Sequence, residues 1–334
     1  MSGPKARRLV AVLASATVVP SLAGGPASHA SPEISVYTAG YDSTLPTAEV
    51  DKLDPTGERL WRFNGGGIGD DVEVDPDGYV HAVVANSVVK FDPNGEVVWS
   101  YPGNLDEFVT TVTVDADGFA YAGVEREEGV TTTCDVRKLD PNGSLVFSTS
   151  TPCVPNALAI DGDGNVYSAG SRQIVKYTQD GEVAWRYGEH DGIVRGVAVD
   201  PEGMVYSASW DDEVHKIDPD GQRVWAYTGH SDSVFDVAVD SEGDIYTAAA
   251  DFEVHKLSPE GERYWAYTGH HTGRVVQVAV DEHGNAYTAS QDDEVHKIDA
   301  DGNHLWAYTG HTSAVRAVAV DPGAYTVAGH DRGR

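Results

Sequence analysis

The sequence predicts an all-β fold, a seven-bladed β-propeller whose blades are four-stranded antiparallel sheets. One observation is a repeat of about 40 residues, since the stretch from Val197 to His230 recurs almost letter for letter from Val237 and from Val278. A second is that each copy contains short runs rich in Val, Ile, Tyr and Trp, bounded by Gly, Pro or Asp, as strands are. A third is that no run has a sustained helical period, so no helix is expected. Copies of this length bury their sheet faces when they stack radially, as in a propeller.

Within one copy, four strands are expected, at Val197–Asp200, Met204–Ala208, Glu213–Ile217 and Val224–Tyr227. The first and second strands are joined by Asp-Pro-Glu-Gly, and the third and fourth by Asp-Pro-Asp-Gly. Asp and Pro favour a type I turn, and the Gly that follows suits a left-handed backbone. The copy is therefore predicted to fold as an antiparallel meander.

Two positions of the repeat hold an equivalent residue in every copy, and counting these residues gives the number of blades. The Asp that closes the first strand recurs with spacings of 40, 46, 39, 40, 41 and 40 residues, at Asp75, Asp115, Asp161, Asp200, Asp240, Asp281 and Asp321. An aromatic residue lies four residues after the second turn's Gly in every copy, and these expected docking residues are Trp61, Trp99, Phe147, Trp185, Trp225, Trp265 and Trp306. Seven equivalent positions predict seven blades.

The two ends of the chain are expected to share one blade. The first copy begins at its second strand, whereas the chain ends with one more first strand, at Ala317–Asp321. That C-terminal strand is expected to pair with the N-terminal strands, which is a velcro closure. Both Val36–Ala39 and Tyr325–Ala328 fit the second position of this blade, and the sequence leaves the choice open.

Residues 1–30 precede the repeats and predict a secretory signal peptide. Three basic residues come before an apolar stretch at 9–23, and Ser28 and Ala30 supply small residues at a cleavage site. The adjacent arginines among the basic residues would also suit a twin-arginine signal. Residues 31–334 are expected to form a single propeller domain that is secreted or lies at the cell surface.

The charge of the chain limits its partners. The formal net charge is −30, and removal of residues 1–30, which carry three basic and no acidic residues, takes it to −33. Such a surface argues against nucleic acid as a partner and against anionic membranes. It suits a soluble monomer in a medium of high ionic strength, where ions screen the repulsion, and a halophilic source is our hypothesis.

The third copy departs from the others. It carries an insertion at Glu125–Val130, has Phe147 in place of Trp, and contains both cysteines, Cys134 and Cys153. The cysteines flank the third and fourth strands, at loops expected on one face. A disulfide is the favoured interpretation for an exported protein and would contribute ~3 kcal/mol, while two free thiols are the alternative. If the symmetric scaffold holds an asymmetric site, we expect it first in this copy.

One column of the repeat contains lysine in every copy: Lys52, Lys90, Lys138, Lys176, Lys216, Lys256 and Lys297. A ring of seven ammonium groups would suit an anionic ligand. The alternative is that each aliphatic stem packs between blades and each ammonium meets a neighbouring carboxylate. The alternative is favoured, because packing repeats from blade to blade whereas binding sites break the symmetry.

Four loop histidines are each followed by an Asp 20 to 22 residues later: His190 with Asp211, His230 with Asp251, His270 with Asp292, and His311 with Asp331. The two loops lie on one face, so each His is expected to hydrogen-bond its Asp. Such a pair can bind metal or transfer protons. A structural role is favoured, because catalytic pairs normally occur once. A second histidine column, at His215, His255 and His296, is interpreted as packing.

Acidic runs are the remaining candidates for chemistry. Asp161–Asn165 resembles the start of a calcium loop, but it lacks the later bidentate Glu and coincides with a hairpin turn. The runs at 211–213 and 292–294 are interpreted as solvated surface. The sequence has no nucleophile elbow, phosphate loop or metal-spaced Cys/His cluster. No cofactor or metal is therefore predicted, and calcium is the one ion left open.

Three repeat families resemble this one. Lys216–Gly221 with Trp225 resembles the tryptophan-docking motif of pyrroloquinoline-quinone-like (PQQ-like) repeats. VAVDPEGMVY and VHKIDPDG resemble NHL repeats, and the pairing of His230 with Asp251 is similar to that in WD-repeat blades. Each resemblance implies a propeller. Quinoprotein dehydrogenases of the first family use an adjacent cysteine pair, whereas the cysteines here are 19 residues apart, so the resemblance does not extend to that enzyme.

These features predict a non-catalytic, secreted propeller that acts as a rigid binding or scaffold module for a protein or other ligand, through its acidic loop face and central funnel. The alternative is a cofactor- or calcium-dependent enzyme, either a quinone-binding oxidoreductase or a lyase or hydrolase, with its site in the funnel. Seven equivalent residues around the axis would favour the scaffold. Unlike polar residues converging there would favour the enzyme.

Overall fold

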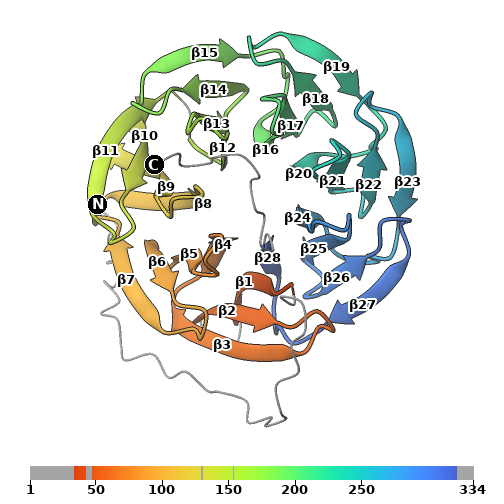
Figure 1. Ribbon diagram of the computed structural model, residues 1–334, viewed down its shortest axis with the longest axis horizontal. Helices are drawn as coiled ribbons and strands as arrows, with labels where there is room; N and C mark the ends of the chain where they lie inside the picture. Colours follow the sequence, from red (N-terminus) through yellow and green to blue (C-terminus); the bar gives the residue numbers. More distant parts are fainter. Residues whose placement is uncertain (1–33, 43–46, 129–130, 153, 322–334) are drawn as a thin grey trace, which may run out of the picture.

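The computed structural model describes residues 34–42, 47–128, 131–152 and 154–321. In this part of the chain 28 strands form seven four-stranded antiparallel sheets, with no helix and hence none that could cross a membrane. The sheets stand side by side around a central axis (Figure 1). The predicted fold class is confirmed. The predicted signal peptide, residues 1–30, lies outside the described residues.

The strands form four concentric rings. The innermost ring contains β4 (Gly69–Val74), β8 (Glu107–Val114), β12 (Ala157–Ile160), β16 (Val194–Val199), β20 (Val234–Val239), β24 (Val275–Val280) and β28 (Val315–Val320). The second contains β1 (Val36–Asp42), β5 (Val80–Val84), β9 (Ala120–Glu128), β13 (Val166–Gly170), β17 (Val205–Ser209), β21 (Ile245–Ala249) and β25 (Ala286–Ser290). The third contains β2 (Thr47–Leu53), β6 (Ser87–Phe91), β10 (Thr131–Leu139), β14 (Gln173–Tyr177), β18 (Val214–Ile217), β22 (Val254–Leu257) and β26 (Val295–Ile298). The outermost contains β3 (Arg59–Gly66), β7 (Val97–Pro102), β11 (Leu145–Thr151), β15 (Val183–Tyr187), β19 (Arg223–Tyr227), β23 (Arg263–Tyr267) and β27 (His304–Tyr308).

The C-terminal strand completes the blade that begins the chain. Blade 1 has the strand order β28-β1-β2-β3, and blades 2 to 7 follow as β4–β7, β8–β11, β12–β15, β16–β19, β20–β23 and β24–β27. Val36 pairs with Val320 and Ala39 with Ala317, so β1 takes the position that the sequence left open. The alternative, Tyr325–Ala328, lies outside the described residues. The velcro closure is present as predicted.

An aromatic residue on the outermost strand joins each blade to the next. The Trp225 indole N–H donates to the carbonyl of Pro259, 3.0 Å away. Its ring lies against Gly261, whose φ of +85° suits glycine and where a Cβ would come 3.1 Å from the indole. The same contact closes the ring of blades, because the Trp306 indole donates to the carbonyl of Pro55 at 2.9 Å.

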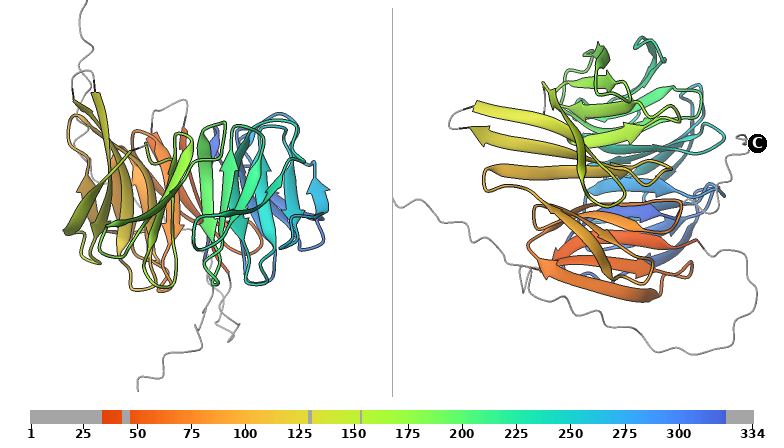
Figure 2. Two further views of the ribbon diagram at one scale, coloured as in Figure 1. Left: turned by 90° about the horizontal axis from the view of Figure 1, so that it is seen from above. Right: turned by 60° about the vertical axis from the view of Figure 1, so that its left-hand side comes forward.

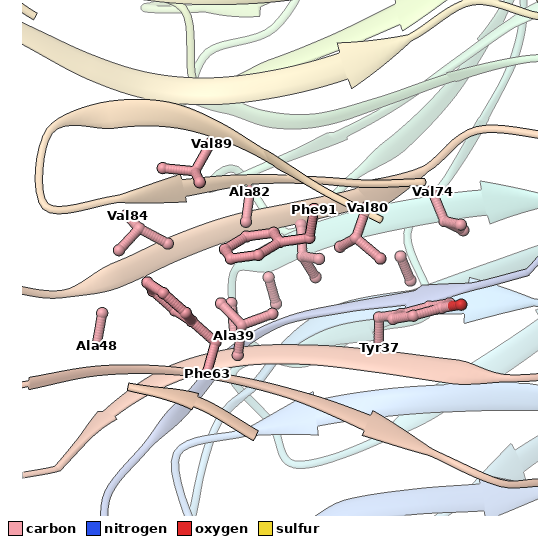
Figure 3. Packing of buried hydrophobic residues seen from close by; sticks show 14 of the residues in the cluster. Tyr37, Ala39, Ala48, Phe63, Val74, Val80, Ala82, Val84, Val89 and Phe91 are labelled. Atoms are coloured by element: carbon pink, nitrogen blue, oxygen red, sulfur yellow. The ribbon is translucent and has the colours of Figure 1, made fainter. Parts of the chain in front are cut away.

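The core lies between neighbouring blades. In the seam between blades 1 and 2, Phe63 meets Phe91 edge to face, with the ring centroids 4.7 Å apart (Figure 3). Tyr37, Val80 and Val84 surround this pair. Each blade therefore buries both of its faces, which a single sheet cannot do alone.

Blade 3 extends beyond the others. Its strands β9 and β10 have nine residues each, and their hairpin projects from one face of the disc (Figure 2). The hairpin carries the insertion noted at Glu125–Val130, of which residues 129–130 lie outside the described part. The insertion therefore lengthens a hairpin and leaves the four-stranded blade intact.

Candidate functional site

The seven innermost strands surround an axial cavity of about 1000 Å³. Equivalent residues can be compared by counting back from the Asp that closes each of these strands, which is Asp200 in blade 5. The first and third residues before this Asp are Val, Ile or Leu in all seven blades. These two rows are uniform and apolar.

Three other rows break the sevenfold symmetry. From blade 1 to blade 7, the fifth residues before the Asp are Arg316, Asp70, Thr110, Asn156, Arg195, Phe235 and Val276. The fourth residues are Ala317, Asp71, Thr111, Ala157, Gly196, Asp236 and Gln277. The second residues are Ala319, Glu73, Thr113, Ala159, Ala198, Ala238 and Ala279. Unlike polar residues therefore converge on the axis.

Part of this polarity joins neighbouring blades. Asp71 Oδ2 accepts from the backbone N–H of Val112 at 2.9 Å, and Asp236 Oδ2 accepts from the N–H of Val278 at 3.0 Å. In each case the acceptor is the side chain four positions before the closing Asp of one blade. The donor is the backbone N–H three positions before the closing Asp of the next blade. Blades with Ala or Gly at this position lack such a side-chain bridge, so the fold does not require it in every seam.

Four carboxyl groups in the cavity have raised pKa values, and in Asp70 burial raises the pKa although Arg316 lies beside it. Burial raises the pKa of Glu73 to about 8, and the nearby carboxylates of Asp71 and Asp236 add to the effect. Burial also raises the pKa of Asp236 to about 7 and that of Asp71 to about 6. Near neutral pH, Glu73 is therefore mostly protonated while Asp71 is mostly ionised. Glu73 forms no hydrogen bond with another side chain of the described residues.

Arg195 and Phe235, which line the cavity, each contact Trp210 beside it. Arg195 donates to Asn156 Oδ1 at 3.1 Å, and its guanidinium lies 5.5 Å from the ring centroid of Trp210. Trp210 is 42% exposed and meets Phe235 edge to face. A small ligand approaching blades 5 and 6 would thus contact both charge and an aromatic surface.

Three of the predicted His–Asp pairs lie within hydrogen-bonding distance. The Nδ1 to carboxylate distances are 3.0, 2.9 and 2.9 Å for His190 with Asp211, His230 with Asp251, and His270 with Asp292. The opposite ring nitrogens lie 2.9, 2.7 and 2.8 Å from the hydroxyl groups of Ser207, Thr247 and Thr288. Both nitrogens of each buried ring are therefore engaged, which leaves none for a metal or a substrate.

The fourth loop histidine has other partners. His311 Nε2 is 2.8 Å from the hydroxyl group of Thr38, and its Nδ1 is 3.2 Å from a Glu49 oxygen. Asp331, its predicted partner, lies outside the described residues, so that pair stays a prediction.

The strand histidines stack on the loop histidines. The ring centroids are 3.8, 3.9 and 4.0 Å apart for His190 with His215, His230 with His255, and His270 with His296. His215 also hydrogen-bonds the Tyr187 hydroxyl and a Glu213 oxygen, each at 2.7 Å. Burial, together with the stacked neighbour, lowers the pKa of His190 and of His255 to about 4. His190 and His255 are thus neutral at pH 7, and all six rings are buried, hydrogen-bonded parts of the core.

The seven lysines lie away from the axis. Each ammonium is within 5.3 Å of the centroid of an aromatic ring, and the rings belong to Tyr37, Tyr79, Phe119 and Tyr121, Tyr167, Tyr206, Tyr246 and Tyr287. Lys90 also pairs with Asp75 at 3.2 Å, and Lys256 with Asp244 at 2.9 Å. No lysine lines the described cavity, so these ammonium groups form no anion-binding ring there.

The irregular blade 3 holds a buried ion pair in place of stacked histidines. Hydrogen bonds from Arg137 lower the pKa of Glu107 to about 2, and Arg126 adds a second guanidinium. Phe147 has no indole N–H, and the hydroxyl group of Thr149 donates instead to the carbonyl of Gly181 at 2.9 Å. At both places blade 3 thus makes its contacts with other residue types than the regular blades use.

The predicted disulfide is not tested, and the segment that resembles the start of a calcium loop forms the hairpin turn that the sequence favoured. Cys134 is buried in β10, and Cys153 lies outside the described residues, so the disulfide stays a prediction. The Asp161 carboxylate accepts from the backbone and side chain of Asn165, which closes its own turn. Among the described residues no group of three His, Cys, Asp or Glu side chains is placed to hold a metal ion.

A family comparison agrees with the fold. Residues 110–234 match the family described as SMP-30/Gluconolactonase/LRE-like region. The match runs from β8 to the start of β20, which is under half of the chain, and this β-propeller family includes lactonases and other hydrolases. No curated protein matches the chain significantly. The chain is thus consistent with a propeller repeat protein, while its PQQ-like, NHL-like or WD-like character stays a prediction.

Sequence reasoning missed Asp71, Glu73 and Asp236. It compared the copies for what they share, and these residues stand where the copies differ. The sequence does contain a signal for them, because the recurring Asp at the end of each innermost strand fixes the register in which the seven strands can be compared.

Proposed function

We propose that this protein is a non-catalytic binding module that holds a small ligand in its axial cavity. The observation that carries the proposal is the set of unlike polar residues on the innermost strands, in a scaffold whose other rows are uniform. Small-molecule sites are concave and carry a few polar groups that fix the orientation of the ligand. The axial cavity is concave and carries such groups, although its exposed lining is more polar than apolar.

Glu73 gives the strongest support. Five blades have Ala at its position, so the fold tolerates a methyl group there. Glu73 is half-buried, and removing a carboxyl group from water costs free energy, which is why its pKa is raised. Residues that break a local rule in this way are expected at functional sites.

The test is thermal unfolding of residues 31–334 in the presence of a library of small polar compounds. A ligand that binds only the native state must raise the midpoint saturably. We expect a hit with the unmodified protein and a loss of its effect in Glu73→Ala. Glu282→Gln, at an exposed carboxylate that does not line the cavity, is the control and should keep the effect. Equal shifts for all three proteins would contradict a site at Glu73.

A second candidate is a hydrolase acting in the same cavity. It is favoured by the separation of two carboxyl pKa values, about 8 for Glu73 and about 6 for Asp71, because a protonated and an ionised carboxyl group can serve as general acid and general base. The family matched by residues 110–234 carries gluconolactonase in its description. The test is hydrolysis of a sugar lactone by the unmodified protein and by Glu73→Gln, which should be inactive.

Secretion, a monomeric state and a protein partner are also part of the proposal. The pattern of residues 1–30 supports export, and the net charge supports solubility without nucleic acid or membrane insertion. The acidic runs at 211–213 and 292–294 would offer a partner protein a negative loop face. Fractionation of the host cells, followed by size-exclusion chromatography, tests the location and the monomer together.

A further inference from the structure

We infer that the ligand of the axial cavity carries a carboxylate group and an aromatic ring, and that the carboxylate pairs with Arg195 while the ring packs against Trp210 and Phe235. This inference rests on the proposed function and names the chemical class of its ligand. Arg195 lies in β16 and Phe235 in β20, and both line the cavity. Trp210 follows β17 and contacts both of them.

The guanidinium group of Arg195 forms no ion pair with the described residues. Its one hydrogen bond among them goes to Asn156 Oδ1, so most of its N–H groups have no protein acceptor. Burial lowers the pKa of Arg195, the Asp236 carboxyl group opposes this effect at longer range, and the Arg316 guanidinium adds to it. A half-buried positive charge without an ion pair is unfavourable, and an anion in contact with it would remove that cost.

The equivalent arginine of blade 1 has the partner that Arg195 lacks. Arg316 and Arg195 both stand five positions before the closing Asp of their innermost strands. Arg316 donates to the Asp70 carboxylate of the next blade, 2.9 Å away. Asp70 stands at the same position of its own strand, and there the blade that follows Arg195 has Phe235. The scaffold can thus place a carboxylate beside an arginine of this row, and beside Arg195 a ligand would have to supply it.

The indole of Trp210 offers a surface to the ring of such a ligand. Six of the seven tryptophans are docking residues, and Trp210 is the seventh. Its side chain is 42% exposed, and the next two copies have Ala250 and Gln291 at this position, so the blade does not require an aromatic ring there. An exposed indole in contact with a second ring and with a guanidinium has the composition of a binding hot spot.

The charges around these rings permit an anion. Arg274 of blade 7 places a second guanidinium 5.9 Å from the centroid of Phe235. Asp236, the acidic residue whose charge acts on Arg195, has a pKa of about 7 and is therefore only about half ionised at neutral pH. Its Oδ2 already accepts the backbone N–H of Val278. Asp236 therefore does little at neutral pH to repel a ligand carboxylate from Arg195.

The experiment is isothermal titration calorimetry of residues 31–334 at pH 7 with phenylacetate, 2-phenylethanol and acetate. Phenylacetate carries both the ring and the carboxylate, 2-phenylethanol carries the ring alone, and acetate carries the carboxylate alone. We expect saturable binding of phenylacetate, at least about tenfold tighter than that of either other probe, because a hydrogen bond to a charged group contributes that much or more.

Three variants assign the binding to its residues. Arg195→Gln should weaken the binding of phenylacetate about tenfold and leave that of 2-phenylethanol unchanged, because it removes the charge and keeps the rings. Trp210→Gln, which copies the natural Gln291 of blade 7, should weaken the binding of both ring-bearing probes. Arg223→Gln changes an arginine of the outermost strand that does not line the cavity, and this matched control should alter neither affinity.

The outcomes separate this inference from the proposed function. Preferential binding of phenylacetate that is lost in Arg195→Gln supports it. Equal affinities for phenylacetate and 2-phenylethanol, or an affinity for phenylacetate that Arg195→Gln leaves unchanged, overturn it. In that case, binding of 2-phenylethanol that is lost in Trp210→Gln would still leave a ligand site in the cavity. If no probe binds the protein, the inference also fails, and the library screen then decides the proposed function alone.

Discussion

The outer strands of this propeller repeat the same residue types from blade to blade, whereas the innermost strands do not. On the outer three strands, Lys216 stands between its cross-strand neighbours Tyr206 and Trp225, and every blade repeats a lysine beside an aromatic ring. On the innermost strands, equivalent positions hold Asp, Thr, Ala, Gly and Gln. Each seam has the same surface to bury, so packing imposes equivalent residues there. The axis faces a cavity, so packing leaves its residues free to differ.

Acid should disrupt the repeated part most strongly. Burial lowers the pKa of His190 and His255 to about 4 in the folded state, below the unfolded value near 6.5. As the pH falls from 6.5 to 4, the unfolded chain binds protons that the folded chain cannot, so each ring costs ~3 kcal/mol of stability by pH 4. Urea unfolding between pH 7.5 and pH 4 measures this loss.

A His255→Gln variant is the control for the acid effect. It removes one of the depressed pKa values and should lower stability at pH 7.5 but lose less on acidification. An unchanged dependence on pH would show that other groups cause the acid effect.

Trp225→Ala tests how much one seam contributes. The change removes the contact with Gly261 and the hydrogen bond to Pro259, and we expect a loss of about 3 kcal/mol in the free energy of unfolding. Trp225→Phe, which copies the natural Phe147 of blade 3, should cost about 1 kcal/mol, for the hydrogen bond alone. Denaturant unfolding distinguishes the two. Equal losses would mean that the indole ring contributes little packing.

Glu73→Ala should raise the free energy of unfolding, whereas Trp225→Ala should lower it. A carboxyl group whose folded pKa is raised disfavours folding above its unfolded pKa near 4.3, and linkage alone would make this cost about 3.5 kcal/mol at pH 7. Because Glu73 is only half-buried and solvent screens it, we expect its removal to stabilise the protein by about 2 kcal/mol. The gain should disappear near pH 4, where both states are protonated. Thermal unfolding at the two pH values measures it. A loss of stability at pH 7 would show that Glu73 serves packing, as the outer residues do.

Gln277→Ala should have the smallest effect. Its Oε1 accepts from the backbone N–H of Val318 at 2.7 Å, a bond between blade 7 and the C-terminal strand. We expect a loss of about 1 kcal/mol, because Ala157 and Ala317 show that other seams hold without such a bond. The shift in thermal midpoint checks this, with Thr113→Ala as a variant that removes no such bridge. A much larger loss would make the axial bridges a main source of stability.

The sequence predicted what the repeats share and missed what they do not. Blade number, strand order and closure all follow from columns that recur seven times. The choice between Val36–Ala39 and Tyr325–Ala328 could not be made, because the two segments fit one strand pattern equally well. We expected an asymmetric site in the irregular third copy, yet the carboxyl groups of the axial cavity whose pKa values are raised lie in blades 2 and 6, whose outer strands are regular.

The histidines show a second limit of sequence reasoning. A common spacing placed His230 opposite Asp251, since a loop and a turn on one face must meet. That His255 would stack on His230 at 3.9 Å could not be foreseen, because it depends on where a third-strand side chain lies relative to a loop. Interpreting His255 as packing was therefore incomplete.

Blade 1 is built from strands of both ends of the described chain, so it is complete only when the last of these strands has been made. β1 is among the first strands made and β28 is the last of the described strands, yet they are hydrogen-bonded neighbours. Until β28 arrives, β1 presents an unpaired edge, which is a site for aggregation and for recognition by chaperones. A polypeptide interrupted before β28 would keep that edge open. The pairing of β28 with β1 therefore completes blade 1 only after the other six blades have been made.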